Sequence, residues 1–239
     1  MKTFLIACFT VSMILTSCFF SSIICEKGSG KVIKQEIFKS GFTSLNLMNS
    51  ANLLVTQGNA EKIIIETDEN ILNFLETEIN NGELILSNKL SICPSKLNYY
   101  ITMKDIKGFK ILGAGNIISK TPIKSDDLSL NIQGSGDIKF DSVDLIKLHV
   151  KILGSGDVKI KGSTEKFVSE INGSGDIYAN GLTCDYARIE TNGSGDVRVM
   201  VNKELIANIN GSSDILYKGN PENVKVKING SGNVREIEK

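Results

Sequence analysis

Gly134-Ser135-Gly136-Asp137-Ile138 is the stretch that decides the fold, because the same pattern returns along the second half of the chain. The first glycines of successive copies are 18 to 21 residues apart. A fixed period in this range is typical of a solenoid, in which each repeat forms one coil. The other copies, some with Ala, Asn or Ser at one position, begin at Gly113, Gly154, Gly173, Gly193, Gly211 and Gly230.

Apolar residues alternate with polar ones on both sides of the motif, as in Leu128, Leu130 and Ile132 before it and Ile138 after it. Period two predicts strands with this parity facing the interior. The motif glycines fall on the same parity, so we expect close contact between coils to leave no room for a Cβ there. These structural glycines include Gly134, Gly136, Gly154, Gly156, Gly173, Gly175, Gly193 and Gly195.

Units of ~20 residues that are nearly all strand must pair with the next unit rather than within themselves. The sequence therefore predicts an all-β protein, a right-handed parallel β-helix. A leucine-rich repeat is the alternative, but the chain lacks its Leu-x-x-Leu-x-Leu frame. We expect one domain over 31–239, with irregular first coils over 31–108 and the regular repeats over 109–239. Within the irregular half, Asp68 to Glu78 predicts one short amphipathic helix with Asp68 as its N-cap.

The N-terminus reads as an export signal, because Lys2 is followed by an apolar run that ends in Leu15-Thr16-Ser17-Cys18. This ending resembles the lipobox of bacterial lipoproteins. We therefore predict a signal peptide over 1–17, lipidation of Cys18 and a tether over 18–30, with the acyl chains holding the exported domain at a membrane of the cell envelope. The alternative is an uncleaved membrane helix, since no charge occurs between Thr3 and Cys25.

After such cleavage and lipidation of Cys18, Cys25, Cys93 and Cys184 remain as thiols, which allows one disulfide at most. We expect Cys93 and Cys184 to be buried and inert, and their pairing stays open. The chain has 27 basic and 27 acidic residues. This balance gives no basic excess for binding nucleic acid. The sequence predicts no metal site and no cofactor.

The aspartates of the motif form a possible surface ladder of Asp137, Asp157, Asp176, Asp196 and Asp214. Three arrangements would relieve the repulsion between stacked carboxylates: bound Ca²⁺, basic neighbours two residues on, or hydrogen bonds from nearby backbone N–H groups. The basic neighbours are Lys139, Lys159, Arg198 and Arg235. A second outward column has Asn172, Asn192, Asn210 and Asn229. Such rows suit contact with carbohydrate or protein, or serve only as structural ladders.

The order of pieces from Phe42-Thr43-Ser44-Leu45 through Asn81-Gly82-Glu83-Leu84 to the Gly-Ser-Gly-Asp repeats resembles the family described as putative auto-transporter adhesins, head GIN domain. The resemblance implies a lipid-anchored β-helix of the cell envelope with no established activity. We expect a non-enzymatic structural or adhesion module. The alternative is a polysaccharide-binding or polysaccharide-cleaving protein, for which Asp157, Asp176, Asp196 and Arg198 would be the candidates.

Overall fold

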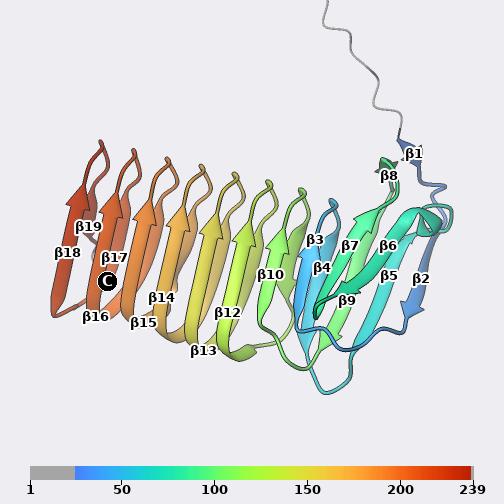
Figure 1. Cartoon of the computed structure of the whole chain (residues 1–239), viewed down its shortest axis with the longest axis horizontal. Helices are drawn as coiled ribbons and strands as arrows, with labels where there is room; N and C mark the ends of the chain where they lie inside the picture. Colours follow the sequence, from blue (N-terminus) through green and yellow to red (C-terminus); the bar gives the residue numbers. More distant parts are fainter. Residues whose placement is uncertain (1–24, 238–239) are drawn as a thin grey trace, which may run out of the picture.

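The computed structural model describes residues 25–237, and strands dominate it (Figure 1). About 63% of the chain is strand, arranged as a β-solenoid of about 6 turns. The all-β solenoid predicted from the repeats is therefore confirmed. Its repetitive part consists of β10 (Gly108–Ile111), β11 (Asn116–Ser119), β12 (Ile123–Ile132), β13 (Ile138–Ile152), β14 (Val158–Ile171), β15 (Ile177–Thr191), β16 (Val197–Ile209), β17 (Ile215–Gly219), β18 (Asn223–Ile228) and β19 (Val234–Glu236).

These strands pair in parallel, each with its equivalent in the next coil. The register places residues of one parity in columns that face the interior. One such column is fully buried until the last coil, where Val226 is 47% exposed, and it contains Leu130, Val150, Ser169, Ile189, Ala207 and Val226. The core is thus an aliphatic stack that each following coil covers.

The first coil of the stack comes from a distant part of the sequence. β3 (Ser44–Leu47) pairs in parallel with β10, and β4 (Asn52–Gln57) pairs in parallel with β11. After β4 the chain builds on the opposite side of this coil and joins the repeats only at Gly108, 51 residues later by sequence number. This excursion builds the cap at the N-terminal end.

The cap combines parallel and antiparallel pairing. β7 (Glu83–Asn88) and β9 (Leu97–Met103) continue the stack in parallel with β3 and β4. β5 (Lys62–Asp68) runs antiparallel to both β9 and β2 (Val32–Ile37), while β6 (Leu75–Asn80) runs antiparallel to β7. A separate two-stranded sheet joins β1 (Glu26–Lys27) to β8 (Ile92–Cys93). In Figure 1 the cap lies at the end opposite the label C.

The helix predicted from Asp68 to Glu78 is wrong. β5 ends at Asp68, a 3-10 turn covers Leu72–Phe74, and β6 starts at Leu75. No side chain caps the turn, because the Asp68 carboxylate accepts hydrogen bonds from Gly30 and Ser95 instead. Pairing with β7 then fixes the following residues as strand, which shows tertiary contacts overriding a local helical pattern.

The expectation of a buried, inert Cys93 is also wrong. Cys93 is exposed and forms a disulfide with Cys25, whereas Cys184 is a free and buried thiol. Cys93 and Cys184 therefore do not pair. Within the described range, no helix is both long enough and apolar enough to cross a membrane.

Candidate functional site

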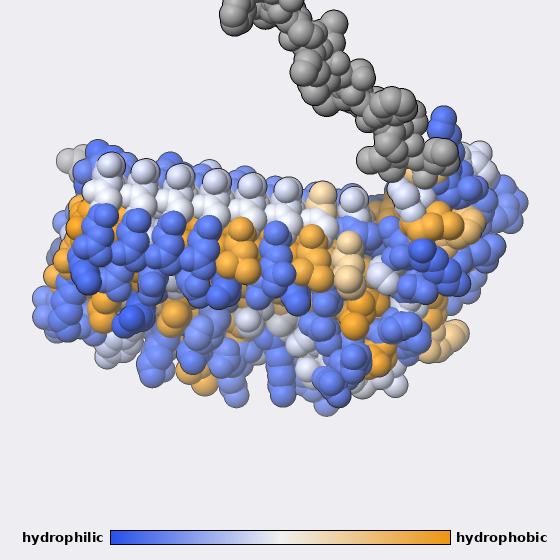
Figure 2. Space-filling model, turned by 45° about the horizontal axis from the view of Figure 1, so that its top comes forward, coloured by the Kyte–Doolittle hydropathy of each residue, from blue (hydrophilic) through white to orange (hydrophobic). Residues whose placement is uncertain are grey.

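The repeated corners form a continuous ridge along one edge of the solenoid. The backbone N–H of each motif serine donates to the first motif glycine of the preceding coil, as from Ser155 to Gly134 at 3.1 Å. A Cβ on Gly136, Gly156 or Gly175 would overlap the carbonyl group of the equivalent glycine one coil earlier. Glycine therefore lets the corners stack this closely in every copy but one, where the buried Ser213 takes the second position, and Figure 2 shows the result as a mostly pale row.

The aspartate column lies beside this row and is a hydrogen-bonded ladder. Asp137 Oδ1 accepts from the backbone N–H of Asp157 at 2.8 Å, and Asp157 Oδ1 accepts from Asp176 at 2.9 Å. The same bond joins Asp176 to Asp196, Asp196 to Asp214 and Asp214 to Asn233. Of the three arrangements considered from the sequence, bonding to backbone N–H groups is the one that every coil uses.

Basic neighbours contribute unevenly to this ladder. Arg235 pairs with Asp214 at 3.2 Å, and the pKa of Asp214 is lowered, chiefly by a hydrogen bond from the Asn233 side chain. Tyr178 donates its hydroxyl to Asp176 Oδ2 at 2.8 Å, which raises the pKa of Tyr178. Lys159 and Arg198 both lie against the ring of Tyr178, at 5.2 and 5.1 Å from its centroid. Lys139 pairs instead with Asp141.

The asparagine column forms a second ladder on the other side of the corners. The amide Nδ2 donates to the Oδ1 of the asparagine one coil earlier, at 2.7 to 2.8 Å, from Asn229 to Asn210, from Asn210 to Asn192 and from Asn192 to Asn172. The ladder ends there, because Asn172 Nδ2 donates to Glu170 of its own coil. The sequence indicated this column, and its structural reading as a ladder is the observed arrangement.

The aspartate ladder continues into the cap through residues that lie outside the repeat. Asn116 Oδ1 accepts from the N–H of Asp137, and Asn116 Nδ2 donates to Asn52, which donates to Asn98. Asn98 donates to Glu66 Oε2, the last acceptor of the series. Sequence reasoning missed this extension, because Asn52 and Asn98 belong to no repeated motif.

Glu66 is a nearly buried carboxylate, 8% exposed. It accepts from the Tyr100 hydroxyl at 2.7 Å and pairs with Lys96 at 3.1 Å. The bond from Tyr100 is the largest of the influences that lower its pKa from 4.5 to about 2. The series of hydrogen bonds therefore ends, on the cap side, at a carboxylate whose lowered pKa keeps it ionised at neutral pH.

Beside the aspartate ladder stands a row of exposed serines, which from Ser174 on also has the asparagine ladder on its other side: Ser135, Ser155, Ser174, Ser194, Ser212 and Ser231. Among the described residues, no protein group hydrogen-bonds to their hydroxyls, whereas the aspartate ladder, and the asparagine ladder from Asn172 on, are bonded from coil to coil. Strands in a sheet lie ~4.8 Å apart, so the hydroxyls repeat at about this distance. We call the serine row and its two flanking ladders the polar ridge.

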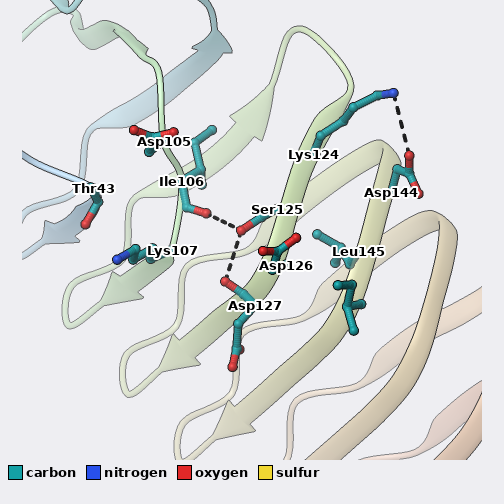
Figure 3. Close-up of a pocket in the computed structure, with 11 residues that line it drawn as sticks. Thr43, Asp105, Ile106, Lys107, Lys124, Ser125, Asp126, Asp127, Asp144 and Leu145 are labelled. Carbon is teal, nitrogen blue, oxygen red and sulfur yellow. Dashed lines mark hydrogen bonds and ion pairs between the residues drawn. The ribbon is translucent and has the colours of Figure 1, made fainter.

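A groove of about 970 Å³ lies elsewhere, where the chain rejoins the stack (Figure 3). Asp105, Asp126 and Asp127 line it together with the ion pair between Lys124 and Asp144. Ser125 Oγ lies within hydrogen-bonding distance of the Ile106 and Asp127 carbonyls. Within residues 25–237, no three acidic, histidine or cysteine side chains are grouped so as to hold a metal ion.

The other candidates from the sequence are placed as follows. Cys18, the predicted lipidation site, lies outside the described residues. Asp157, Asp176 and Asp196, candidates for polysaccharide cleavage, are consecutive members of the aspartate ladder, and Arg198 lies beside it. Their carboxylates thus have the same backbone-bonding role in each coil.

Comparisons with known proteins agree with this architecture. A crystal structure of a putative adhesin from Bacteroides fragilis matches with 24% identity and a TM-score of 0.85, over 88% of this chain and 99% of that one. A putative lipid binding protein and a putative adhesin, both from Parabacteroides distasonis, match with 24% and 22% identity and TM-scores of 0.75 and 0.72. These matches cover 89% and 90% of this chain and 99% and 100% of those structures.

The three structures support the fold alone at this level of identity. No curated protein sequence matches the chain. The family model described as "Putative auto-transporter adhesin, head GIN domain" matches residues 41–221, which include the first coil, the cap strands from β5 to β9 and nearly all repeats. The chain therefore belongs to the putative auto-transporter adhesin, head GIN domain family.

Proposed function

We propose that this protein is an exported, lipid-anchored and non-enzymatic module of the cell envelope that binds an extended polysaccharide along the polar ridge. The observation that carries the proposal is the row of free serine hydroxyls beside the self-bonded aspartate ladder, with the self-bonded asparagine ladder on its other side from Asn172 on. A polymer that repeats its hydroxyl groups along its length meets this row at several coils. Individually weak contacts then add, because each further contact is intramolecular.

The anchoring part of the proposal rests on the sequence. Residues 1–17 would be removed as a signal peptide, Cys18 would carry the acyl chains, and 18–30 would lead into a right-handed β-helix domain over 31–239. The first described residue, Cys25, is attached to the cap by its disulfide. A tether before Cys25 would therefore hold the solenoid by its capped end and leave the ridge accessible along its whole length.

A polysaccharide array tests the binding. In the ridge variant, Ser155, Ser174 and Ser194 are replaced by Lys, which blocks three successive coils of the row. The control variant carries Lys at Ser142, Ser163 and Asn180, three exposed positions in the middle of successive coils, so that both variants gain three positive charges. We expect the ridge variant to lose binding at least tenfold and the control to retain it. Equal binding by both variants, or depolymerisation of a bound polysaccharide, would overturn the proposal.

The anchor has a separate test. The Cys18→Ala variant is expected to incorporate no radiolabelled fatty acid in cells, whereas the wild type is labelled. Unchanged labelling of the variant would remove Cys18 as the anchor and would leave the ridge proposal standing.

A further inference from the structure

The segment Cys25 to Lys31 is fastened to the cap by covalent and polar contacts. The Cys25–Cys93 disulfide joins positions 68 residues apart. Beside it, β1 pairs with β8, and the Gly28 N–H donates to the Cys93 carbonyl at 3.0 Å. Asn70 accepts from the Ser29 N–H and donates to the Lys27 carbonyl, both at 2.8 Å. These contacts fasten the segment to β8 and to Asn70, which follows the end of β5.

Asp68 is the polar centre of this attachment and is 0% exposed. Its carboxylate accepts from the Gly30 N–H, the Ser95 N–H and the Ser95 hydroxyl, each at 2.7 Å. A Cβ on Gly28 would overlap this carboxylate, so the segment lies directly on it. The side chain thereby links the N-terminal segment to the residues just after Cys93.

The two segments of the chain that lead away from the disulfide differ in how many neighbouring strands they pair with. On the N-terminal side, the chain continues into β2, which pairs with β5 alone among the described strands and has no fully buried residue. On the other side, Cys93 leads within four residues to β9, which pairs with β4 on one flank and with β5 on the other. Strand β9 is therefore held in the sheet on both sides and β2 on one side.

We propose that the Cys25–Cys93 disulfide is a tension bypass, which carries a pull on the N-terminus directly to β9 and keeps residues 26–92 out of the load path. The proposal rests on the proposed anchoring before Cys25, because an anchored protein that holds a partner is pulled from this end. With the bond intact, tension cannot peel β1 and β2 from the cap. With the bond reduced, the load enters at β2 and removes the cap strand by strand.

Force spectroscopy on the full chain, held by tags fused to its two ends, tests the bypass. An extended chain spans roughly 3.3 to 3.6 Å per residue, so the 68-residue separation of Cys25 and Cys93 corresponds to about 23 nm. We expect the oxidised wild type to unfold fully with a contour about 23 nm shorter than that of the Cys93→Ser variant. We also expect the first rupture of the variant at a lower force. Reduction of the folded wild type should reproduce both changes, which covers the case in which the variant folds poorly.

Cys184→Ser is the matched control, since this thiol is free and lies outside the enclosed loop. It should show the oxidised wild-type contour. Equal contours before and after reduction, or an unchanged first rupture force without the bond, would overturn the bypass. The handles attach through the tags, so a failure of Cys18 labelling would remove the anchor without affecting this result.

Discussion

Gly156→Ala places a methyl group where two coils touch. Its Cβ would overlap the carbonyl carbon and oxygen of Gly136 and lie 3.1 Å from Cγ2 of Ile132. Because the overlapped atoms are backbone, no rotamer change relieves the contact, and the coils must separate at this corner. Overpacking of this kind costs about 1 to 3 kcal/mol.

Separation also weakens two hydrogen bonds of the corner, from Ser155 N–H to the Gly134 carbonyl and from Asp157 N–H to Asp137 Oδ1. Each contributes about 1 kcal/mol. Replacing glycine lowers the entropy of the unfolded chain, which returns roughly 0.4 to 1 kcal/mol. The expected net loss in the free energy of unfolding is about 3 kcal/mol, a large part of the ~5 to 15 kcal/mol typical of a domain.

Urea unfolding followed by far-UV circular dichroism measures this loss, with Ser155→Ala as the control. Ser155 is the adjacent residue, is exposed and already has a Cβ, so its replacement should change the free energy of unfolding by at most ~0.5 kcal/mol. A loss below ~1 kcal/mol for Gly156→Ala, or an equal loss for both variants, would refute steric exclusion between coils as the reason for the repeated glycines.

Four further perturbations test the ladder and the cap. Asp157→Ala removes the acceptor of the Asp176 N–H and should cost about 1 to 3 kcal/mol, whereas Asp157→Asn keeps an Oδ1 and should cost much less. EDTA should leave the melting temperature unchanged, and a fall of many degrees would instead indicate a metal bound to the ladder. The folded-state pKa of Glu66 is about 2, below its ordinary 4.5, so the stability that it contributes is present above pH 4.5 and is lost as the pH falls toward 2. Urea midpoints of wild type and Glu66→Gln should therefore differ at pH 7 and converge near pH 2; a constant difference would contradict this role. A disulfide that closes a loop of 68 residues stabilises by up to about 4 kcal/mol. Cys93→Ser should lose about 2 to 4 kcal/mol, and a reductant should destabilise the wild type equally while leaving the variant unchanged.

The repetitive half of the fold could be predicted because its information is local and repeated. Alternation at Leu128, Leu130 and Ile132 fixes which side faces the core, and the spacing of the motif fixes the pairing partner. The cap has no repeated motif whose spacing would fix its strand pairing. β5 pairs with β2 and β9 at distances along the chain that no local pattern specifies, and the contacts of Asp68 replace the helix that its sequence favours.

The candidate site could likewise be predicted in its repetitive part and not in the cap. The aspartate and asparagine columns follow from the repeat, because equivalent positions of successive coils must stack. The end of the aspartate ladder at Glu66 depends on Asn52 and Asn98, which reach it only through the excursion of the chain between β4 and β10. The Cys25–Cys93 bond likewise depends on the cap, since three cysteines allow three pairings and their spacing selects none.

The direction of the hydrogen bonds explains why the two ends of the solenoid differ. In both ladders each coil donates to the coil before it, so each ladder needs a final acceptor, which for the asparagine ladder is Glu170, bonded by Asn172 within its own coil. Glu66 supplies it for the aspartate ladder, and a carboxylate is suited to this position because it accepts several donors and strengthens each bond by its charge. At the other end, the last coil needs donors, and its exposed Asn229 and Asn233 can take them from water. There the edge strand β18 is uncovered among the described residues, and its outward Lys225 and Lys227 oppose pairing with another strand. The sequence thus closes one end by specific bonds and protects the other by charge.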